Sequence, residues 1–371
     1  MTFRELTMPA QRFFPALLLT GIAALVWGSP PADAVEQQGG HAPATSADGQ
    51  HAFDFHFGTW RTHILSRRRS ASGASQWAKM TGTVIDQPLW NGRANLEKIE
   101  ASGSGRHFQG LTLFLYEPAS GNWSQQYADS SDGIMSEPAY GKFENGRGVL
   151  YSWSGSAGSR VLDRDTWSNI TPSSYHFEIA SSADGGKTWQ TNFIAQLTRL
   201  EKAPDYRTPD TPGSGPEHGF DFNMGTWKTQ IRASLSPLSA PGSWSNLQGT
   251  HSVYRVWGGW ADIGQLEIDG PGGHVEDLAL RLYDRDTRQW RVYFANSKSG
   301  ILEQPMVGEF KDGVGTFVGL QDMDGKTVLT RNVWSDITAK SCRQDWAIST
   351  DGGKTWVPTW ISTDTRSEER G

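Results

Sequence analysis

Short stretches of the chain alternate between apolar and polar side chains with a period of two. Segments 111–116 and 278–283 are examples, and this alternation is typical of half-buried β-strands. Asn-Gly and Asp-Gly pairs, which supply the positive φ that tight hairpin turns require, recur between these stretches. No amphipathic helical pattern runs through residues 35–371. The pattern therefore predicts an all-β fold made of antiparallel hairpins.

The whole pattern occurs twice. Residues 53–60 return as 220–227, at an offset of 167 positions. The same offset joins several pairs of tryptophans: Trp77 and Trp244, Trp90 and Trp257, Trp123 and Trp290, Trp167 and Trp334, Trp189 and Trp356. Chance does not place so many tryptophans in register, so the chain is one domain written twice. Because a sheet with many hairpins avoids open edges by closing on itself, we predict two tandem β-barrels, at 51–200 and 217–367, that contact each other. The proline-rich segment 201–216 joins them.

Composition and charge narrow the possible partners. The 371 residues carry a net charge of −6, and no basic patch predicts a nucleic-acid partner. Residues 1–34 have a basic start, an apolar stretch at 13–27 and an Ala-x-Ala end, which is typical of a secretory signal cleaved after Ala34. An uncleaved membrane anchor is the alternative. We expect a secreted or periplasmic protein with a disordered lead at 35–50 and no integral membrane segment in the mature chain.

A G-x-W motif opens each copy, at Gly58–Trp60 and Gly225–Trp227. This motif resembles the first-strand signature of lipocalins and the wider calycin group, which implies up-and-down barrels. In that group an arginine near the end of the barrel packs over the tryptophan. The resemblance therefore implies that Arg199 lies over Trp60 and Arg366 over Trp227, as structural barrel closures.

A closer resemblance covers nearly all of both copies. The F-D-F-x-x-G-T-W opening, the R-x-x-W-S-x-I-T segments at 164–171 and 331–338, and the S-x-D-G-G-K-T-W ends are similar to a largely uncharacterised bacterial family of secreted, lipocalin-like proteins. The family implies a barrel with a small-molecule cavity and supplies no assigned reaction. Members of that family have a single domain, so the tandem duplication in this chain is a departure from the family.

Two motifs are interpreted as structural. The segments 182–189 and 349–356 match the Asp-box of sialidases, but two boxes 167 positions apart do not make a propeller, so we interpret each as a hairpin turn. Cys342 is the only cysteine and is expected to be a buried bystander. Because the chain has no H-x-H, H-x-x-x-H or Cys/His cluster, the sequence predicts no metal site and no cofactor. His56 and His63 occur in the first copy only.

Ionisable and aromatic residues kept at equivalent positions of both copies are the candidate ligand-binding residues. An apolar barrel face that holds one carboxylate and one guanidinium binds a polar head group, and a tyrosine on the neighbouring strand is the natural third partner. Aligned histidines serve as ligand or acid–base groups. The alternatives are surface salt bridges and rim histidines. The candidates are Glu100, Tyr116, Arg164 and His107 in the first copy, and Glu267, Tyr283, Arg331 and His274 in the second.

The function that these features favour is binding of a small, partly apolar molecule in a barrel cavity. Unpaired tryptophans are candidates for copy-specific contacts: Trp153, Trp260, Trp346 and Trp360. Two alternatives stay open. One is an enzyme (an isomerase, cyclase or hydrolase) that acts on an apolar substrate in the same cavity, and the other is a structural module of the cell envelope. No nucleophile–base motif decides whether the protein is an enzyme.

Overall fold

The computed structural model consists almost entirely of β-strands. It describes residues 49–69, 75–155, 159–201, 215–234, 236–239, 242–270, 273–323 and 325–367. The expected signal segment, its cleavage site after Ala34 and most of the linker lie outside the described residues. The described helices are five single 3₁₀ turns: η1 (Asp54–His56), η2 (Trp90–Gly92), η3 (Pro216–His218), η4 (Asp221–Asn223) and η5 (Trp257–Gly259).

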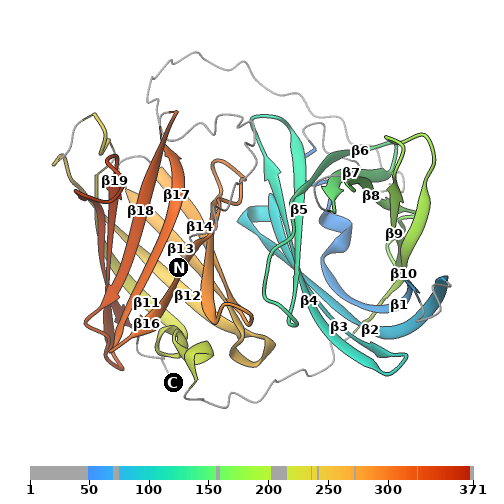
Figure 1. Ribbon diagram of the computed structural model, residues 1–371, viewed down its shortest axis with the longest axis horizontal. Helices are drawn as coiled ribbons and strands as arrows, with labels where there is room; N and C mark the ends of the chain where they lie inside the picture. The colour runs from blue at the N-terminus through green and yellow to red at the C-terminus, as the bar shows by residue number, and fades with distance from the viewer. Residues whose placement is uncertain are drawn as a thin grey trace, which may run out of the picture.

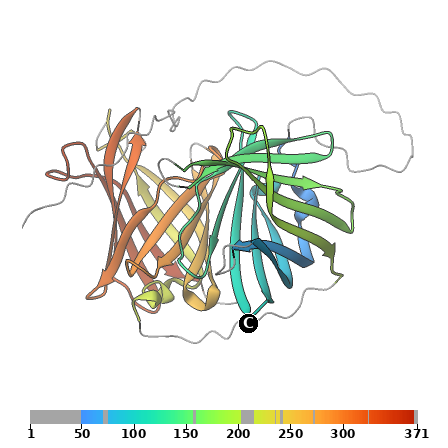
Figure 2. The ribbon, with the colours of Figure 1, turned by 45° about the vertical axis from the view of Figure 1, so that its right-hand side comes forward.

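Each copy forms a closed antiparallel barrel in which chain neighbours are sheet neighbours (Figures 1 and 2). The first consists of β1 (Gly58–Arg69), β2 (Ser75–Leu89), β3 (Ala94–Gly103), β4 (Arg106–Glu117), β5 (Asn122–Asp129), β6 (Ala139–Glu144), β7 (Arg147–Ser154), β8 (Val161–Ser168), β9 (Ser174–Ser182) and β10 (Gln190–Arg199). The second consists of β11 (Gly225–Ala233), β12 (Ser245–Val256), β13 (Ala261–Gly270), β14 (Gly273–Asp284), β15 (Gln289–Asn296), β16 (Met306–Lys311), β17 (Val314–Met323), β18 (Lys326–Ser335), β19 (Ser341–Ser349) and β20 (Val357–Arg366). Pairing of β1 with β10 and of β11 with β20 closes the two rings. The predicted fold class, two tandem up-and-down barrels, is confirmed.

An arginine at the end of each last strand joins the closing strand to the opening strand. The guanidinium carbon of Arg199 lies 4.0 Å from the ring centroid of Trp60, its Cα partner in the β1–β10 pair. Arg366 lies 4.1 Å from Trp227 in the second barrel. Each cation covers the indole face at a distance typical of cation–π contacts.

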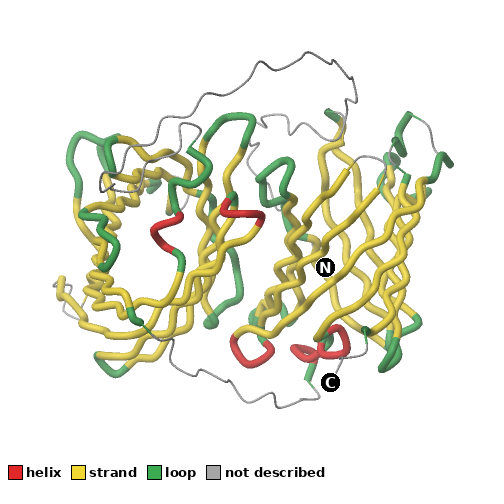
Figure 3. Tube along the Cα trace, turned by 180° about the vertical axis from the view of Figure 1, so that it is seen from behind, coloured by secondary structure: helices red, strands yellow, loops and turns green. Residues whose placement is uncertain are grey.

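The same arginine also anchors the segment that precedes the first strand. Arg199 donates to the backbone carbonyls of Phe55 (3.0 Å), Phe57 (2.6 Å) and Pro172 (2.7 Å). η1 lies in this segment, and Figure 3 draws it in red between the strands of the first barrel. Arg366 makes the equivalent bonds to Phe222, Met224 and Ala339. Arg199 therefore joins the pairing of β1 with β10 to the segment that precedes β1. We call this segment, which contains η1, the plug.

Phe53, just before η1, is the centre of the plug. It is fully buried and its ring contacts Phe114, Trp123, Phe143 and Trp167 at centroid distances of 4.7–5.1 Å. Aromatic rings in edge-to-face contact fill such a space with large apolar area. Phe220 takes the same position in the second barrel, against Trp290, Phe310, Phe317 and Trp334.

A third apolar core lies between the barrels. Alternate residues of β4 face the two sides of the sheet. Phe114 and Tyr116 therefore belong to the core of the first barrel, whereas the leucines that alternate with them along the strand belong to a core shared with the second. The members from the first copy are Leu89, Trp90, Ala94, Leu96, Leu111, Leu113, Leu115, Ala128 and Met135, and those from the second are Val256, Trp257, Ala261, Ile263, Leu278, Leu280, Leu282, Tyr293 and Ala295. Almost all are equivalent pairs, as in the self-complementary interface of a two-fold dimer.

Two glycines make reciprocal contacts across this interface. A Cβ on Gly133 would lie 2.2 Å from the carbonyl oxygen of Tyr283, and a Cβ on its equivalent Gly300 would lie 1.8 Å from that of Tyr116. Tyr116 and Tyr283 are themselves equivalent positions. Both glycines also have positive φ (70° and 63°). The close approach of the two backbones and the backbone conformation therefore each favour glycine at these positions.

The Asp-box segments are hairpin turns. Asp184 accepts hydrogen bonds from the backbone amide (2.9 Å) and the hydroxyl (2.7 Å) of Thr188 and from the hydroxyl of Ser182 (2.7 Å), and these bonds lower the pKa of its carboxyl to about 2. Asp351 does the same in the second barrel. Bonds of this kind stabilise the turn.

None of the helices in the described ranges is long and apolar enough to cross a membrane.

We expect Arg199→Ala to lower the free energy of unfolding by about 1–3 kcal/mol, because a guanidinium bonded to three carbonyls is lost. Hydrogen–deuterium exchange followed by mass spectrometry should show faster exchange in residues 53–60 and 190–199. The second barrel, where Arg366 remains, serves as the internal control. Uniformly faster exchange in both barrels would contradict a local role for Arg199.

We expect Gly133→Ala to destabilise the protein by about 1–3 kcal/mol more than Gly185→Ala, since a methyl group forced against backbone strains the packing. Gly185 has a similar φ of +73° but no atom within 4 Å of its Cβ, so it isolates the steric effect from the conformational one. Urea unfolding of both variants makes the measurement. Equal losses would show that the two backbones are not in close contact.

Candidate functional site

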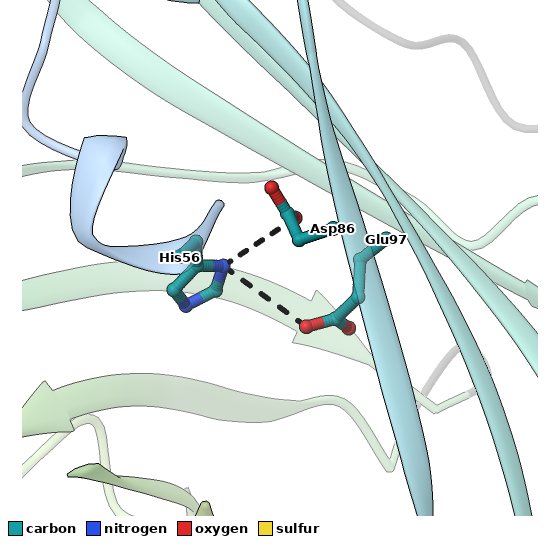
Figure 4. A group of neighbouring side chains, drawn as sticks. All are labelled: His56, Asp86 and Glu97. Atoms are coloured by element: carbon teal, nitrogen blue, oxygen red, sulfur yellow. Dashed lines mark ion pairs between the residues drawn. The ribbon is translucent and has the colours of Figure 1, made fainter. Parts of the chain in front are cut away.

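Three ionisable side chains meet inside the first barrel. His56 comes from η1, Asp86 from β2 and Glu97 from β3, and they are 1%, 2% and 8% exposed. Figure 4 shows Nδ1 of His56 directed at both carboxylates. It lies 3.6 Å from Oδ2 of Asp86 and 4.0 Å from Oε2 of Glu97. We call these three residues the His56 cluster.

The backbone places His56 precisely. Its carbonyl oxygen accepts the indole N–H of Trp60 (2.6 Å), and the flanking carbonyls of Phe55 and Phe57 accept Arg199. The ring of Tyr175 stacks on the imidazole, with the centroids 4.8 Å apart and the planes 24° from parallel. The barrel closure therefore also fixes the histidine of the cluster.

Asp86 and Glu97 lie directly opposite each other in the β2–β3 pair. Like charges at such positions are destabilising, and burial makes the repulsion stronger. Burial first, with a further contribution from Asp86 that the His56 side chain opposes, raises the pKa of Glu97 to about 7. The pair therefore needs a proton or a cation between its members.

Neighbouring polar side chains orient the carboxylates. Asn95 donates its amide to Oδ2 of Asp86 (2.8 Å), and the hydroxyl of Thr112 donates to Oε1 of Glu97 (3.0 Å). Several other buried polar atoms have no hydrogen-bond partner among the residues that the structure describes: both ring nitrogens of His56, Oδ1 of Asp86, Oδ1 of Asn95, Oη of Tyr175 and Oγ1 of Thr62. Buried polar groups are nearly always paired, so a group of unpaired atoms in one place indicates a binding site.

The second barrel has different chemistry at the equivalent positions. Asn223, Val253 and Gly264 replace His56, Asp86 and Glu97. A buried arginine takes over: Arg281, where the first copy has Phe114, lies 3.1 Å from Asp262 and donates to Oδ1 of Asn223 (2.9 Å).

His251 and Cys342 of the second barrel are both held uncharged. Burial and the nearby Arg281 lower the pKa of His251 to about 3. Burial and Asp364 raise the pKa of the Cys342 thiol, so the expected bystander role of this cysteine fits its surroundings. The two copies thus share a scaffold but not a polar core.

The ionisable residues that occur in both copies, and that we predicted to bind a ligand, lie away from the His56 cluster. Glu100 and His107 form an exposed pair (3.5 Å), Glu267 is exposed, and exposed His274 pairs with Asp269 (2.9 Å). These side chains lie as in the alternative of surface salt bridges and rim histidines, and Glu100 and Glu267 do not line the barrel interior.

Arg164 and Arg331 stack on Trp189 and Trp356 of the Asp-box hairpins, at 4.2 and 4.4 Å. The apolar face that suggested an interior position is the outer one, because Trp167, an odd number of residues from Arg164, faces the core. Tyr116 and Tyr283 are buried beside Trp123 and Trp290, so the structure does not bring the predicted carboxylate, guanidinium and tyrosine together.

Sequence reasoning did not assemble the His56 cluster, because Asp86 and Glu97 lie far from His56 in the chain and belong to no motif. The available signal was a difference between the copies. Asp86 and Glu97 are charged where the second copy has Val253 and Gly264. A charge that replaces an apolar residue at an inward-facing strand position indicates a copy-specific site.

A separate cavity of about 250 Å³ lies between the barrels. Equivalent positions of the two copies line it, Gln87 with Tyr254 and Lys98 with Gln265. The ammonium of Lys98 lies 5.5 Å from the ring centroid of Tyr254, and burial lowers the pKa of Lys98.

Comparisons with known proteins find distant structural similarities. No protein-family model and no curated protein matches the chain. The S-type phycobiliprotein lyase CPES from Guillardia theta is 10% identical, with a TM-score of 0.32, over 45% of this chain and 100% of that one. A protein of unknown function from the DUF3598 family of Nostoc punctiforme is 12% identical, with a TM-score of 0.24, over 86% of this chain and 99% of that one. Neither similarity is close enough to assign a family, a ligand or a reaction.

Asp165 on β8 provides a test of the polar interior. Burial first, and then the neighbouring carboxylate of Asp163, raises the pKa of Asp165 to about 7. The folded protein thus holds this proton more tightly than the unfolded chain, in which aspartate titrates near pH 4. The stability it contributes is fully present below about pH 4 and is lost as the pH rises through about 7.

We expect Asp165→Asn, which installs the Asn332 of the second copy, to remove this loss. In the wild type the loss reaches about 1.4 kcal/mol per pH unit between the two pKa values. The variant should therefore have the higher melting temperature at pH 8 and a flatter pH dependence from pH 5 to 8, measured by thermal unfolding. Identical pH dependence in variant and wild type would contradict a protonated Asp165.

Proposed function

We propose that this protein binds a small, partly apolar molecule in its first barrel, with the polar group of the ligand at the His56 cluster. The observation that carries the proposal is the set of buried polar atoms without hydrogen-bond partners at this cluster. A ligand group there satisfies the His56 ring and relieves the repulsion between Asp86 and Glu97.

The aromatic side chains around the cluster favour an apolar body for the ligand. The His56 ring lies 5.2 Å from Phe53, 5.4 Å from Phe114 and 4.8 Å from Tyr175. Aromatic faces of this kind favour an apolar or planar body attached to the polar group. The second barrel, which holds the buried Arg281–Asp262 pair in its interior and has no equivalent of the His56 cluster, is assigned a supporting role.

We also propose that the protein is exported and that it belongs to the secreted, lipocalin-like bacterial family. The basic and apolar start of the chain and its Ala32–Ala34 end support secretion to the periplasm or beyond. The F-D-F-x-x-G-T-W openings support membership of the secreted, lipocalin-like bacterial family. A ligand-binding protein of the envelope is consistent with both.

A second candidate function is an enzyme acting on the same ligand. The distance of 3.6 Å between His56 and Asp86 favours it, because a carboxylate beside an imidazole orients the ring for proton transfer. Conversion of the bound molecule during incubation distinguishes this function from simple binding.

Native mass spectrometry of the protein purified from its own source tests the proposal. We expect an organic molecule bound at one per chain in the wild type and lost in His56→Asn, which installs the second copy's residue. Lys98→Gln, which alters the cavity between the barrels, is the matched control and should retain the ligand. Loss in the control alone would move the site to that cavity. If the wild type carries no organic molecule, the binding function is contradicted, and a structural role in the cell envelope is the hypothesis that remains.

A further inference from the structure

We propose that the His56 cluster also binds one divalent metal ion of the zinc type, coordinated by His56, Asp86 and Glu97. The inference rests on the proposed role of this cluster as a binding site and names an inorganic ligand for it. It adds a metal site that the sequence motifs did not predict.

The three side chains have the arrangement that such an ion requires. Each offers one donor atom, and the three atoms lie within 4.8 Å of one another. They come from η1, β2 and β3 and converge on one place inside the barrel (Figure 4). A shift of the side chains within their rotamers brings donors at this separation around a common ion.

The imidazole itself is the second, independent observation. His56 is 1% exposed, and neither ring nitrogen has a hydrogen-bond partner within the described ranges. A buried imidazole without hydrogen bonds is costly in a structural core. Its Nδ1 is directed at the two carboxylates, where a cation would bind it and neutralise both negative charges.

The residues behind the carboxylates have the role of outer-shell partners. Asn95 and Thr112 hold Asp86 and Glu97 through one oxygen each. The carboxylate oxygens that face His56 Nδ1 are Oδ2 of Asp86, which also accepts the Asn95 amide, and Oε2 of Glu97. Hydrogen bonds of this kind fix the direction of metal-binding carboxylates.

The mixed donor set selects the kind of ion. One imidazole nitrogen and two carboxylate oxygens suit zinc and similar first-row divalent ions. Calcium and magnesium prefer sites made of oxygen alone. Because the second copy has Asn223, Val253 and Gly264 at these positions, the chain should bind one such ion and not two.

The test is titration of the metal-free full chain with zinc by isothermal calorimetry. We expect one tight equivalent per chain, weakened by more than about 100-fold in His56→Asn and in Glu97→Gln, since even outer-shell changes cost 10–100-fold. His107→Asn removes an exposed histidine that also lies beside a glutamate (3.5 Å) and should leave the affinity unchanged. Circular dichroism of each variant verifies that it is folded.

Zinc-edge X-ray absorption of the wild type keeps the inference testable even if the variants unfold. We expect a shell of nitrogen and oxygen with a single imidazole. Sulfur in the shell would place the ion at Cys342, and either that result or no tight equivalent overturns the inference. An organic ligand that still binds the zinc-free protein, with no zinc at His56, would overturn the metal site alone. Zinc at the cluster without any organic ligand would overturn the proposed function alone.

Discussion

The guanidinium of Arg199 makes the contacts on which the rest of the first barrel depends. It covers Trp60 at the seam between the first and last strands and bonds the carbonyls of Phe55 and Phe57. Because His56 lies between those two residues, the bonds that close the barrel also place the imidazole of the candidate site. Arg366 repeats the arrangement around Asn223, so the scaffold is preserved where the chemistry is not.

Duplication leaves each barrel with three surfaces to satisfy: an interior, a solvent face and a face towards the other copy. β4 and β14 meet this demand with leucines on one side and larger or polar residues on the other. Equivalent residues meet across the interface, and the Gly133 and Gly300 turns reach the opposite backbones. Such reciprocity is the signature of a two-fold contact, here made within a single chain.

The two interiors have diverged towards opposite charge arrangements. The first holds two carboxylates opposite each other with a histidine as their neighbour, and the second holds an arginine paired with Asp262. Opposite charges attract each other in the Arg281–Asp262 pair, whereas Asp86 and Glu97 are like charges that repel when both are ionised. This difference is the physical reason why we propose the first barrel, and not the second, as the ligand-binding one.

The sequence by itself determined the fold class and the two copies, because strand period, turn residues and the repeat can be read directly from the chain, and the lipocalin resemblance implied the closing arginines. It could not place Glu100 or Arg164, whose face depends on which side of each strand the closed sheet turns inward. Nor could it assemble the His56 cluster, since only barrel closure brings η1 against β2 and β3. The leucines at 111, 113 and 115 predicted a strand with an apolar face, but only the tertiary structure revealed that this face meets the other copy, because burial depends on what packs against it.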